Sequence, residues 1–446
     1  MQALRFLRAA LARAAGRDPD DLGPATPLLV RGLLLLVNNG VGQGLAFAAS
    51  LAAARLLGVA RFGEYAAVMA LVFVVGMVAE AGLEASLTRE VARDPAASRP
   101  LLLASLRAKA IIGGCIAAAL AFPPVARALA PDAGAVGAVR LAGVLLTLNV
   151  ANSSFAAVFR AWGRMDHVLL VNVSGLAVQL VGTVALLLVT PSVALLIAWL
   201  ALVQVGELLG GVVLFQRGAR RLAAAPGGSA TRARALLRRS LPFALAGVLG
   251  ALQLRVDLLH IEALRGTSAV ALFSVASRLQ GLLTLAPASF FAALFPALAA
   301  AHRGGDAADG FRLYARTLGR MALAGGAVTA AGLALADVMA VAAFGRAYAG
   351  AALPLRILAI QTMPLLLNAT TTLHLYATGR EGLANRVAAL NVGLRAVLGW
   401  ELVRLAGAPG AAVADLAAET IVLAVYWALG VMHERGEVVA LEGVAG

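Results

Sequence analysis

Twelve apolar stretches, each long enough to cross a lipid bilayer as a helix, fill almost the whole chain of 446 residues. The hydrocarbon core of a bilayer needs about 20 apolar residues per helix. Only 13% of the residues are charged, against roughly 25% in soluble domains. The sequence therefore predicts an all-α polytopic membrane protein with about 12 transmembrane helices, approximately at residues 28–54, 65–87, 101–122, 136–161, 168–190, 193–215, 241–261, 269–298, 317–344, 351–377, 383–405 and 410–432.

The segments that flank these helices alternate in arginine content. Flanks on one side hold at most two arginines each, and the flank near Pro191 holds none. Because positively charged loops stay in the cytoplasm, both termini are predicted to face the cytoplasm, in a multi-pass protein of the cell inner (cytoplasmic) membrane. The arginine-rich flanks contain Arg5, Arg8, Arg13, Arg17 and Arg31; Arg89, Arg93, Arg99 and Arg107; Arg160 and Arg164; Arg217, Arg220, Arg221, Arg232, Arg234, Arg238 and Arg239; Arg303, Arg312, Arg316 and Arg320; Arg380 and Arg386; and Arg435.

Charge and composition divide the chain into two halves around a basic linker. Residues 1–27 form a cytoplasmic N-terminal segment whose arginine and leucine spacing fits an amphipathic helix on the membrane surface. An N-terminal six-helix lobe at 28–216 precedes the linker at 217–239, where Pro-Gly-Gly-Ser at 226–229 indicates flexibility. A C-terminal six-helix lobe at 240–432 and a cytoplasmic tail at 433–446 follow.

The two halves resemble each other in sequence. NSSFAAVFRAWGR at 152–164 aligns with NATTTLHLYATGR at 368–380, and a Leu-Gly pair at 57–58 has its counterpart in Arg265-Gly266. Both matches relate a helix to the sixth helix after it, as in transporters built from parallel repeats. We therefore expect duplicated halves. Chance similarity between alanine-rich helices is the alternative.

Several classes of function lack support. The net charge is +14, but the basic loops carry no interleaved aromatic residues, so they indicate anionic lipid headgroups rather than nucleic acid. One cysteine, Cys115, excludes an intramolecular disulfide, and five scattered histidines provide no metal-ligand spacing. The chain has no glycine-rich phosphate loop with a following lysine. No cofactor, metal or catalytic residue is predicted, and the protein is not expected to be an enzyme.

Short motifs occur along most of the chain in a characteristic order. They are RLLG at 55–58 with FGEY at 62–65, EAGL at 80–83 with TRE at 88–90, PF at 242–243, FG at 344–345 with Tyr348, and LRIL at 355–358. Together they resemble the oligosaccharide and polysaccharide flippase branch of the multidrug/oligosaccharidyl-lipid/polysaccharide exporter superfamily. Glu80 stands where that branch more often has Asp.

The resemblance implies a fold and a function. It implies two six-helix lobes around a central cavity that works by alternating access. It also implies a substrate of lipid-diphosphate-linked oligosaccharide, moved from the inner to the outer leaflet for cell-surface polysaccharide biosynthesis. Polysaccharide polymerases or glycosyltransferases are the partners that this function would suggest.

Polar residues inside the predicted helices are the candidates for substrate binding, because an intramembrane charge usually faces a cavity or a partner. Arg255 and Arg278 are predicted to bind the diphosphate, since guanidinium matches phosphate and stays charged when desolvated. The alternative is that Arg255 pairs with Asp257 or reaches the outer surface. We expect the substrate-binding set Arg255, Arg278, Asn38, Asn39, Gln43 and Gln253, in which the asparagines and Gln43 line the sugar path.

Asp257 lies one helical turn from Gln253 and is predicted to be the ion-coupling residue, for a proton or a sodium ion. The alternative is a static ion pair. For other intramembrane charges a structural role is favoured. Glu80 and Glu84 are expected to form a network with Arg89 and Arg93, and the Lys109 side chain is expected to extend to the membrane interface. The remaining ones are predicted to be packing partners: Glu207, Arg395, Asp415 and Glu419.

Three alternative functions remain open at this point. A cation-coupled multidrug antiporter of the same superfamily would need an acidic, aromatic cavity, and only 5% of the residues are aromatic. A membrane-embedded glycosyltransferase or ligase would present carboxylates on large outer loops, and the predicted outer loops are short. A scaffold for a polysaccharide synthesis complex is the third.

Overall fold

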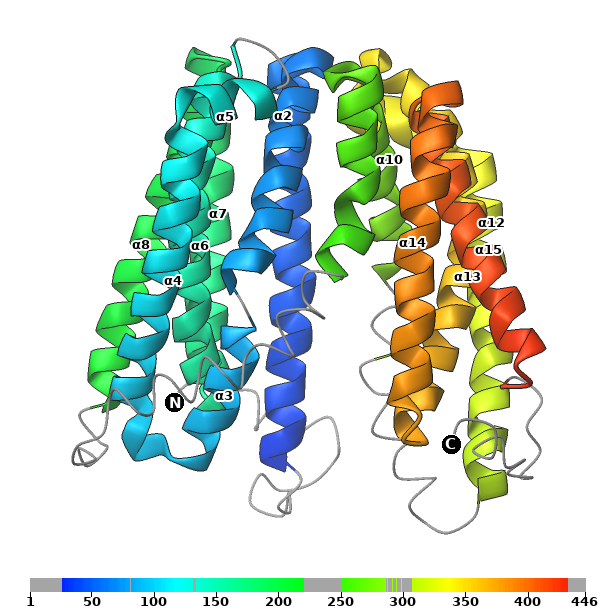
Figure 1. Cartoon of the computed structure of the whole chain (residues 1–446), viewed down its shortest axis with the longest axis horizontal. Helices are drawn as coiled ribbons and strands as arrows, with labels where there is room; N and C mark the ends of the chain where they lie inside the picture. Colours follow the sequence, from blue (N-terminus) through cyan, green and yellow to red (C-terminus); the bar gives the residue numbers. More distant parts are fainter. Residues whose placement is uncertain are drawn as a thin grey trace, which may run out of the picture. The chain divides into compact units, whose positions relative to one another are not determined.

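The computed structural model describes residues 26–80, 82–130, 134–219, 250–285, 287, 291, 294, 298 and 307–431. The predicted N-terminal segment 1–27, linker 217–239 and tail 433–446 lie outside these residues, except at 26, 27 and 217–219. An unlabelled helix covers residues 250–265. The labelled helices (Figure 1) are α2 (Thr26–Glu80), α3 (Leu83–Arg93), η1 (Pro95–Ala97), α4 (Ser98–Ala121), α5 (Pro123–Leu129), α6 (Val136–Ala161), α7 (Met165–Val189), α8 (Val193–Ala219), α10 (Thr267–Leu283), α12 (Ala307–Phe344), η2 (Arg346–Ala351), α13 (Ala352–Ala377), α14 (Glu381–Ala406) and α15 (Ala408–Ala428).

Eight stretches in the described part of the chain are long and apolar enough to span a membrane. Three features account for the difference between this number and the twelve predicted helices. The helix α2 contains a break at Gly58, whose φ and ψ are not helical, and the single stretch found there includes residues of two predicted segments. The helix at 250–265 and α10 are short within the described residues, and Asn391 and Arg395 interrupt the apolar sequence of α14. Each of the twelve predicted segments nevertheless overlaps a helix.

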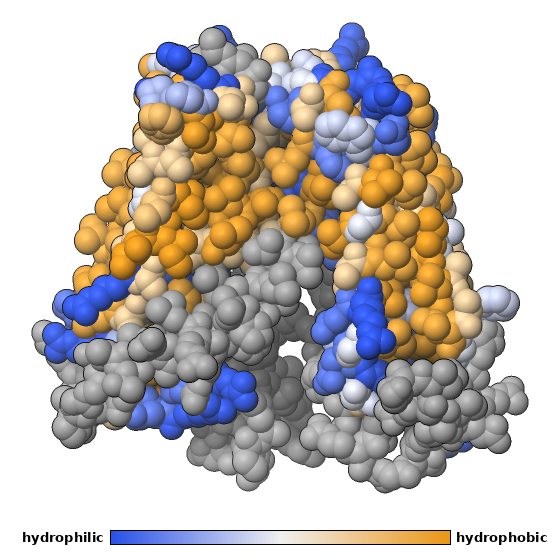
Figure 2. All heavy atoms as spheres, viewed as in Figure 1, coloured by the Kyte–Doolittle hydropathy of each residue, from blue (hydrophilic) through white to orange (hydrophobic). Residues whose placement is uncertain are grey.

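The chain is a multi-pass, all-helical membrane protein. In each part of it, apolar side chains cover the middle of the helices, as Figure 2 shows. Large apolar side chains stay exposed there, such as Val181 at 68% and Leu323 at 78%. A soluble protein would bury such a surface, whereas the hydrocarbon of a bilayer solvates it.

The chain forms two compact units. The first contains residues 1–56 and 72–248, and the second contains residues 57–71 and 249–446. The short segment 57–71, in the middle of α2, therefore packs with the C-terminal half of the chain. In the predicted division into lobes at 28–216 and 240–432, residues 57–71 belong to the N-terminal lobe.

In the first unit, α6 packs against both α4 and α8. Glycine permits the close approach of α4 and α6, because a Cβ at Gly143 would lie only 2.7 Å from the Cα of Ala117. Aromatic side chains fill the space between α6 and α8, where Phe155 and Phe215 meet edge to face with centroids 6.3 Å apart. These contacts fix α6 as the central helix of this unit.

In the second unit, α13 packs against α12 and α15, and α14 packs against α15. The segment 57–71 joins this unit through Phe62, which is fully buried and contacts the ring of Tyr348 edge to face at 6.0 Å. Gly63 lies directly against the carbonyl oxygen of Thr267 at the start of α10. Only glycine fits so close to another backbone.

The ends of α6 and α13 have the same hydrogen-bonded turn. In α6, the N–H of Gly163 donates to the carbonyl of Arg160 and that of Arg164 to Phe159, at 2.9 and 2.8 Å. In α13, Gly379 donates to Tyr376 and Arg380 to Leu375, at 3.3 and 2.8 Å. Both glycines have positive φ, 68° and 75°, which is the Schellman pattern. The turn belongs to the repeated 13-residue motif.

The second repeated pair also shares its backbone conformation. Gly58 has φ 76° and ψ 172°, and Gly266 has φ 73° and ψ −178°. An L-residue rarely adopts such angles. Matching geometry at both pairs of motifs favours duplication of the halves over chance similarity.

Candidate functional site

A polar cavity of about 300 Å³ lies in the first unit, between α6, α7 and α8. Its polar lining includes Asn149, Asn152, Asn172, Gln204 and Glu207. The amide of Asn152 donates to both the backbone and the side-chain oxygen of Gln204, at 2.9 and 2.6 Å. Amides of this kind can exchange hydrogen bonds with sugar hydroxyls. None of these residues belongs to the substrate-binding set predicted from the sequence, and Glu207 is expected there to be a packing partner.

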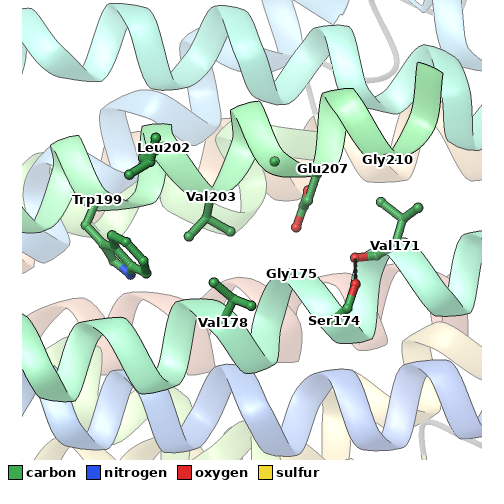
Figure 3. A pocket seen from close by; sticks show the side chains of 10 residues that line it. Val171, Ser174, Gly175, Val178, Trp199, Leu202, Val203, Glu207 and Gly210 are labelled. Carbon is green, nitrogen blue, oxygen red and sulfur yellow. Dashed lines mark hydrogen bonds between the residues drawn. The ribbon is translucent and has the colours of Figure 1, made fainter. Parts of the chain in front are cut away.

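An apolar groove of about 320 Å³, which we call the α7–α8 groove, adjoins this cavity at Val171 and Glu207. Figure 3 shows the carboxylate of Glu207 pointing from α8 toward Gly175 of α7. Trp199 lies on the same helix as Glu207. The groove is lined by Val171, Ser174, Gly175, Val178, Trp199, Leu202, Val203, Gly206, Glu207 and Gly210.

The predicted sugar-path residues lie in α2. The Gln43 side chain is exposed, that is, not covered by other residues of the chain, so its amide is available to a ligand. Asn38 and Asn39 are helical, but the structure describes only their backbone. The role predicted for these three residues stays a prediction.

The two predicted phosphate-binding arginines come together in the second unit. Arg278 of α10 and Arg255 of the helix at 250–265 lie close enough for their charges to interact. The guanidinium of Arg278 lies over the ring of Phe62, 5.7 Å from its centroid. In the part of the chain that the structure describes, no carboxylate forms an ion pair with Arg278. A cation held by an aromatic face rather than by an acid can still accept an anionic ligand.

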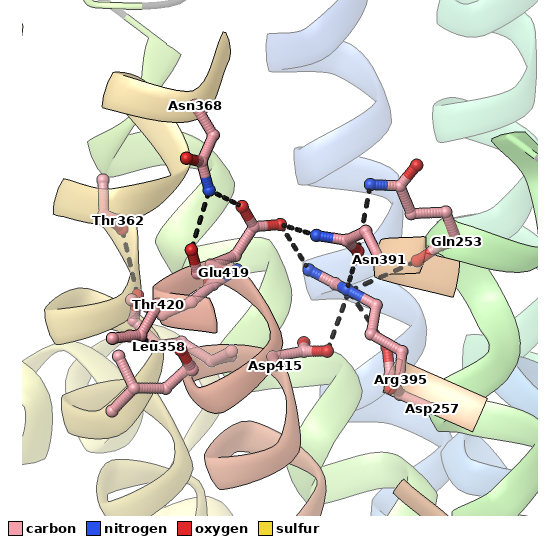
Figure 4. A network of polar contacts seen from close by, with 12 residues as sticks. Gln253, Asp257, Leu358, Thr362, Asn368, Asn391, Arg395, Asp415, Glu419 and Thr420 are labelled. Atoms are coloured by element: carbon pink, nitrogen blue, oxygen red, sulfur yellow. Dashed lines mark hydrogen bonds and ion pairs between the residues drawn. The ribbon is translucent and has the colours of Figure 1, made fainter. Parts of the chain in front are cut away.

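Asp257 and Gln253 face a different partner, Arg395 of α14 (Figure 4). Its guanidinium lies 2.8 Å from the Asp415 carboxylate, 3.1 Å from Glu419 and 3.5 Å from Asp257. It also donates to the backbone oxygen of Gln253 at 3.3 Å. All four charged side chains are at least 90% buried. Among the described residues, Asp257 therefore pairs with Arg395.

The charges in this cluster do not balance. Three carboxylates surround one guanidinium, which leaves a formal charge of −2 if all three are ionised. A buried unpaired charge costs several kcal/mol. Asp257 Oδ1 and Asp415 Oδ1 are buried with no hydrogen-bond partner among the described residues, and a proton on either carboxyl would reduce the unbalanced charge. The geometry therefore provides a place for an exchangeable proton.

Asn368 anchors the same cluster from α13. Its amide donates to the backbone oxygen of Glu419 at 2.8 Å and to its carboxylate at 2.7 Å. Asn152 binds Gln204 in the same way in the first unit. Asn152 and Asn368 are the first residues of the repeated motif. The duplicated contact thus ends on a neutral amide in one half and on a carboxylate in the other.

The remaining intramembrane charges correct several predictions. Lys109 does not extend to the interface: it is fully buried, 2.7 Å from the Glu80 carboxylate and 2.6 Å from the Ser153 hydroxyl. Glu84 pairs with Arg160, so the predicted network exists with other partners than Arg89 and Arg93. The backbone between α2 and α3 has a left-handed conformation at Gly82, so the helix is interrupted between Glu80 and Glu84. The two residues stay in contact there, since the N–H of Glu84 donates to Glu80 Oε1.

A sequence profile of the family described as Polysaccharide biosynthesis protein matches residues 29–302, more than half of the chain. No curated protein matches the chain in sequence.

Solved structures match the whole fold. One is an inward-facing multidrug resistance MATE family transporter of the MOP superfamily, with TM-score 0.69 and 16% identity over 89% of this chain and 94% of that chain. The lipid II flippase MurJ in an inward closed conformation gives TM-score 0.69 and 13% identity, over 89% and 87%. A MOP superfamily transporter from Pyrococcus furiosus, described as having a binding pocket of reverse polarity, gives 0.62 and 16%, over 92% and 95%. At these identities the likeness shows a shared fold.

Proposed function

The chain belongs to the polysaccharide biosynthesis protein family of the MOP superfamily, and we propose that it is a flippase for lipid-diphosphate-linked oligosaccharide. It moves this substrate from the inner to the outer leaflet by alternating access. The proposal includes twelve membrane spans in two six-helix lobes, both termini in the cytoplasm of the cell inner membrane, and no chemical change to the substrate. The family membership and the similarity of fold to a lipid II flippase support it.

The observation that carries this proposal is the pair Arg255 and Arg278. A diphosphate brings about two negative charges into the membrane, and guanidinium groups bind it through charge-assisted hydrogen bonds. Arg278 has no carboxylate partner in the described residues, and its position on Phe62 leaves its donors available. Asn38, Asn39, Gln43 and Gln253 complete the proposed substrate contacts.

We assign Asp257 as the coupling residue, together with Asp415. A proton on either carboxyl would reduce the excess of negative charge in the cluster, and its loss would leave three carboxylates facing Arg395. A proton gradient is the coupling that we propose on this ground, and a sodium gradient is the alternative. Replacing Asp257 with Asn should abolish the dependence of transport on the gradient while substrate binding persists.

The test is transport by the purified protein in liposomes. Labelled lipid-linked oligosaccharide should change leaflet without changing its mass, and Arg278→Gln should slow this movement at least ten-fold, since a hydrogen bond to a charged group contributes about 1.5–3 kcal/mol. Arg404→Gln is the matched control, because Arg404 is exposed and forms an exposed ion pair with Glu401, three residues before it. Transport by Arg278→Gln at the parent rate would remove the arginine site. A changed substrate mass would indicate a glycosyltransferase or ligase instead.

A further inference from the structure

We propose that His260 is the proton relay between the outer side of the membrane and the carboxylates of Asp257 and Asp415. The inference rests on the coupling role proposed for Asp257, and it adds the route by which a proton reaches that carboxylate. It concerns the second unit alone, which contains all three residues.

His260 and Asp257 lie on the same helix, one turn apart. Residues three positions apart share a face of a helix, and the charge of Asp257 acts on the imidazole. Three residues correspond to about 4.5 Å along the helix axis. The arginine bias places the end of this helix outside the cytoplasm, so His260 is the next titratable group toward the outer side on this face.

The helix that carries His260 contacts α14 at three successive levels. At the inner level, Arg395 Nη1 lies 3.5 Å from Asp257 Oδ2. One turn further along α14, a Cβ at Gly399 would lie 2.8 Å from His260 Nδ1. At the outer level, Arg265 donates to a backbone oxygen of α14 at 3.1 Å. His260 therefore lies between the buried cluster and the outer ends of both helices.

The backbone and the aromatic residue beside it hold the imidazole in place. The absence of a side chain at Gly399 leaves the space that the ring occupies, and a larger residue would displace it. Trp400 meets the ring edge to face, with centroids 5.7 Å apart. Its side chain is 46% exposed, and tryptophan is enriched at the interface between membrane and water. The imidazole is thus next to a residue type that marks the interface, where water supplies protons.

The fold leaves one polar atom on each of the two groups without a partner. His260 Nδ1 and Asp257 Oδ1 are buried and have no hydrogen-bond partner in the described part of the chain. Most buried polar atoms in proteins have a partner, and exceptions accompany catalytic groups or bound water. A base and a carboxylate in this state, one turn apart, can exchange a proton.

The charges around His260 come from three elements. Asp257 is on its own helix, Arg395 is one turn inward on α14, and Asp415 of α15 lies 2.8 Å from that arginine. Glu401 of α14 is exposed and lies toward the outer end. The excess of negative charge is on the inner side, so it draws a proton from the imidazole toward the cluster.

The transfer conserves protons at each step. The neutral imidazole accepts a proton at its unprotonated ring nitrogen and becomes imidazolium. It then donates the proton on its other nitrogen to the carboxylate of Asp257 and is neutral again. The net change is one proton moved to the carboxylate. Histidine suits this role because its charge changes near neutral pH.

The test follows protonation of the cluster after a jump from high to low pH. Infrared spectra of the purified full-length protein in detergent should show the carbonyl band of a protonated carboxyl, and the part that Asp257→Asn removes belongs to the cluster. His260→Gln should slow the growth of this part about ten-fold or more and leave its final height unchanged. His167→Gln, at a histidine of α7 in the first unit, is the matched control and should change neither.

A second variant tests the chemistry if His260→Gln alters the packing. His260→Ala leaves a space beside Gly399, and added imidazole should restore the parent rate in this variant. It should not do so in His260→Gln, whose amide fills the space. A purely structural role of the histidine would not respond to imidazole.

Two outcomes would overturn the relay and leave the role of Asp257 intact: equal rates of protonation in the parent and His260→Gln, or no effect of imidazole on His260→Ala. A spectrum of Asp257→Asn identical to that of the parent would overturn the coupling role, and this inference with it. The flipping of oligosaccharide is measured separately in liposomes, so its failure is distinguished from both.

Discussion

Arg395 stabilises the second unit through three acids at once, and its removal should be severe. Arg395→Gln would leave Asp257, Asp415 and Glu419 buried without a cation. Breaking a buried ion pair from one side costs about 3–5 kcal/mol. We expect a large fall in the melting temperature of the purified protein in detergent.

The control for this variant is Arg404→Gln, nine residues further along the same helix. Arg404 and Glu401 are 64% and 55% exposed, and an exposed pair contributes about 0–1 kcal/mol. If Arg395→Gln melted within a degree of the parent, the cluster would not be the closed network that Figure 4 shows.

Lys109 and Glu80 allow a test of pairing itself. Lys109→Met should destabilise the protein by a few kcal/mol, because it leaves a buried carboxylate beside Ser153. Glu80→Gln in the same chain removes that charge, so the double variant should recover a large part of the loss. Thermal melting of the two single variants and the double variant measures the coupling. Additive effects would mean that the two charges do not interact.

The sequence predicted which residues of the candidate site are intramembrane, but not their partners. Asp257, Arg395 and Glu207 stand out because a charge in an apolar segment is visible without a structure. Arg395 and Gln253 are 142 positions apart, and their contact depends on how four helices are rotated against each other. Lys109 illustrates the same limit: a lysine near a helix end and a buried lysine have the same sequence signature.

At the scale of the helix, local sequence signals predicted more of the structure than they did at the scale of the residue. Gly-Arg at 163–164 and at 379–380 predicted matching features, and both form the same turn with positive φ. A turn of this kind is fixed by the few residues that form it. Gly58, which lies between the predicted segments 28–54 and 65–87, has non-helical angles and divides α2 into two helices.

The contact between α2 and α10 gives a prediction for this scale. Gly63→Ala would place a Cβ onto the carbonyl oxygen of Thr267, a backbone atom that cannot move aside easily. Overpacking costs about 1–3 kcal/mol, so we expect a lower melting temperature. Gly281→Ala in α10 has nothing within 4 Å of its Cβ and should be neutral or more stable by up to about 1 kcal/mol, because alanine favours a helix. Equal melting of the two variants would contradict the close contact.

At the scale of the whole molecule, the length of the apolar stretches predicted the class of fold. Hydropathy identifies helices because each must span the same hydrocarbon thickness. It does not tell which neighbours a helix has. The inclusion of residues 57–71 in the second unit rests on specific contacts such as Phe62 with Tyr348, which leave no periodic signal.

The orientation of the chain in the membrane is the prediction that joins these scales. With Cys115 replaced by Ser, one cysteine is introduced at Thr190, between α7 and α8, or at Glu381, at the start of α14; both positions are exposed. The arginine bias places Thr190 outside and Glu381 in the cytoplasm. A membrane-impermeant maleimide added to intact cells with access to the inner membrane should label Thr190→Cys alone, and both variants should react after permeabilisation. Labelling of Glu381→Cys from outside would show that the topology is the reverse of the predicted one. The direction of transport proposed for the arginine site would then be reversed too.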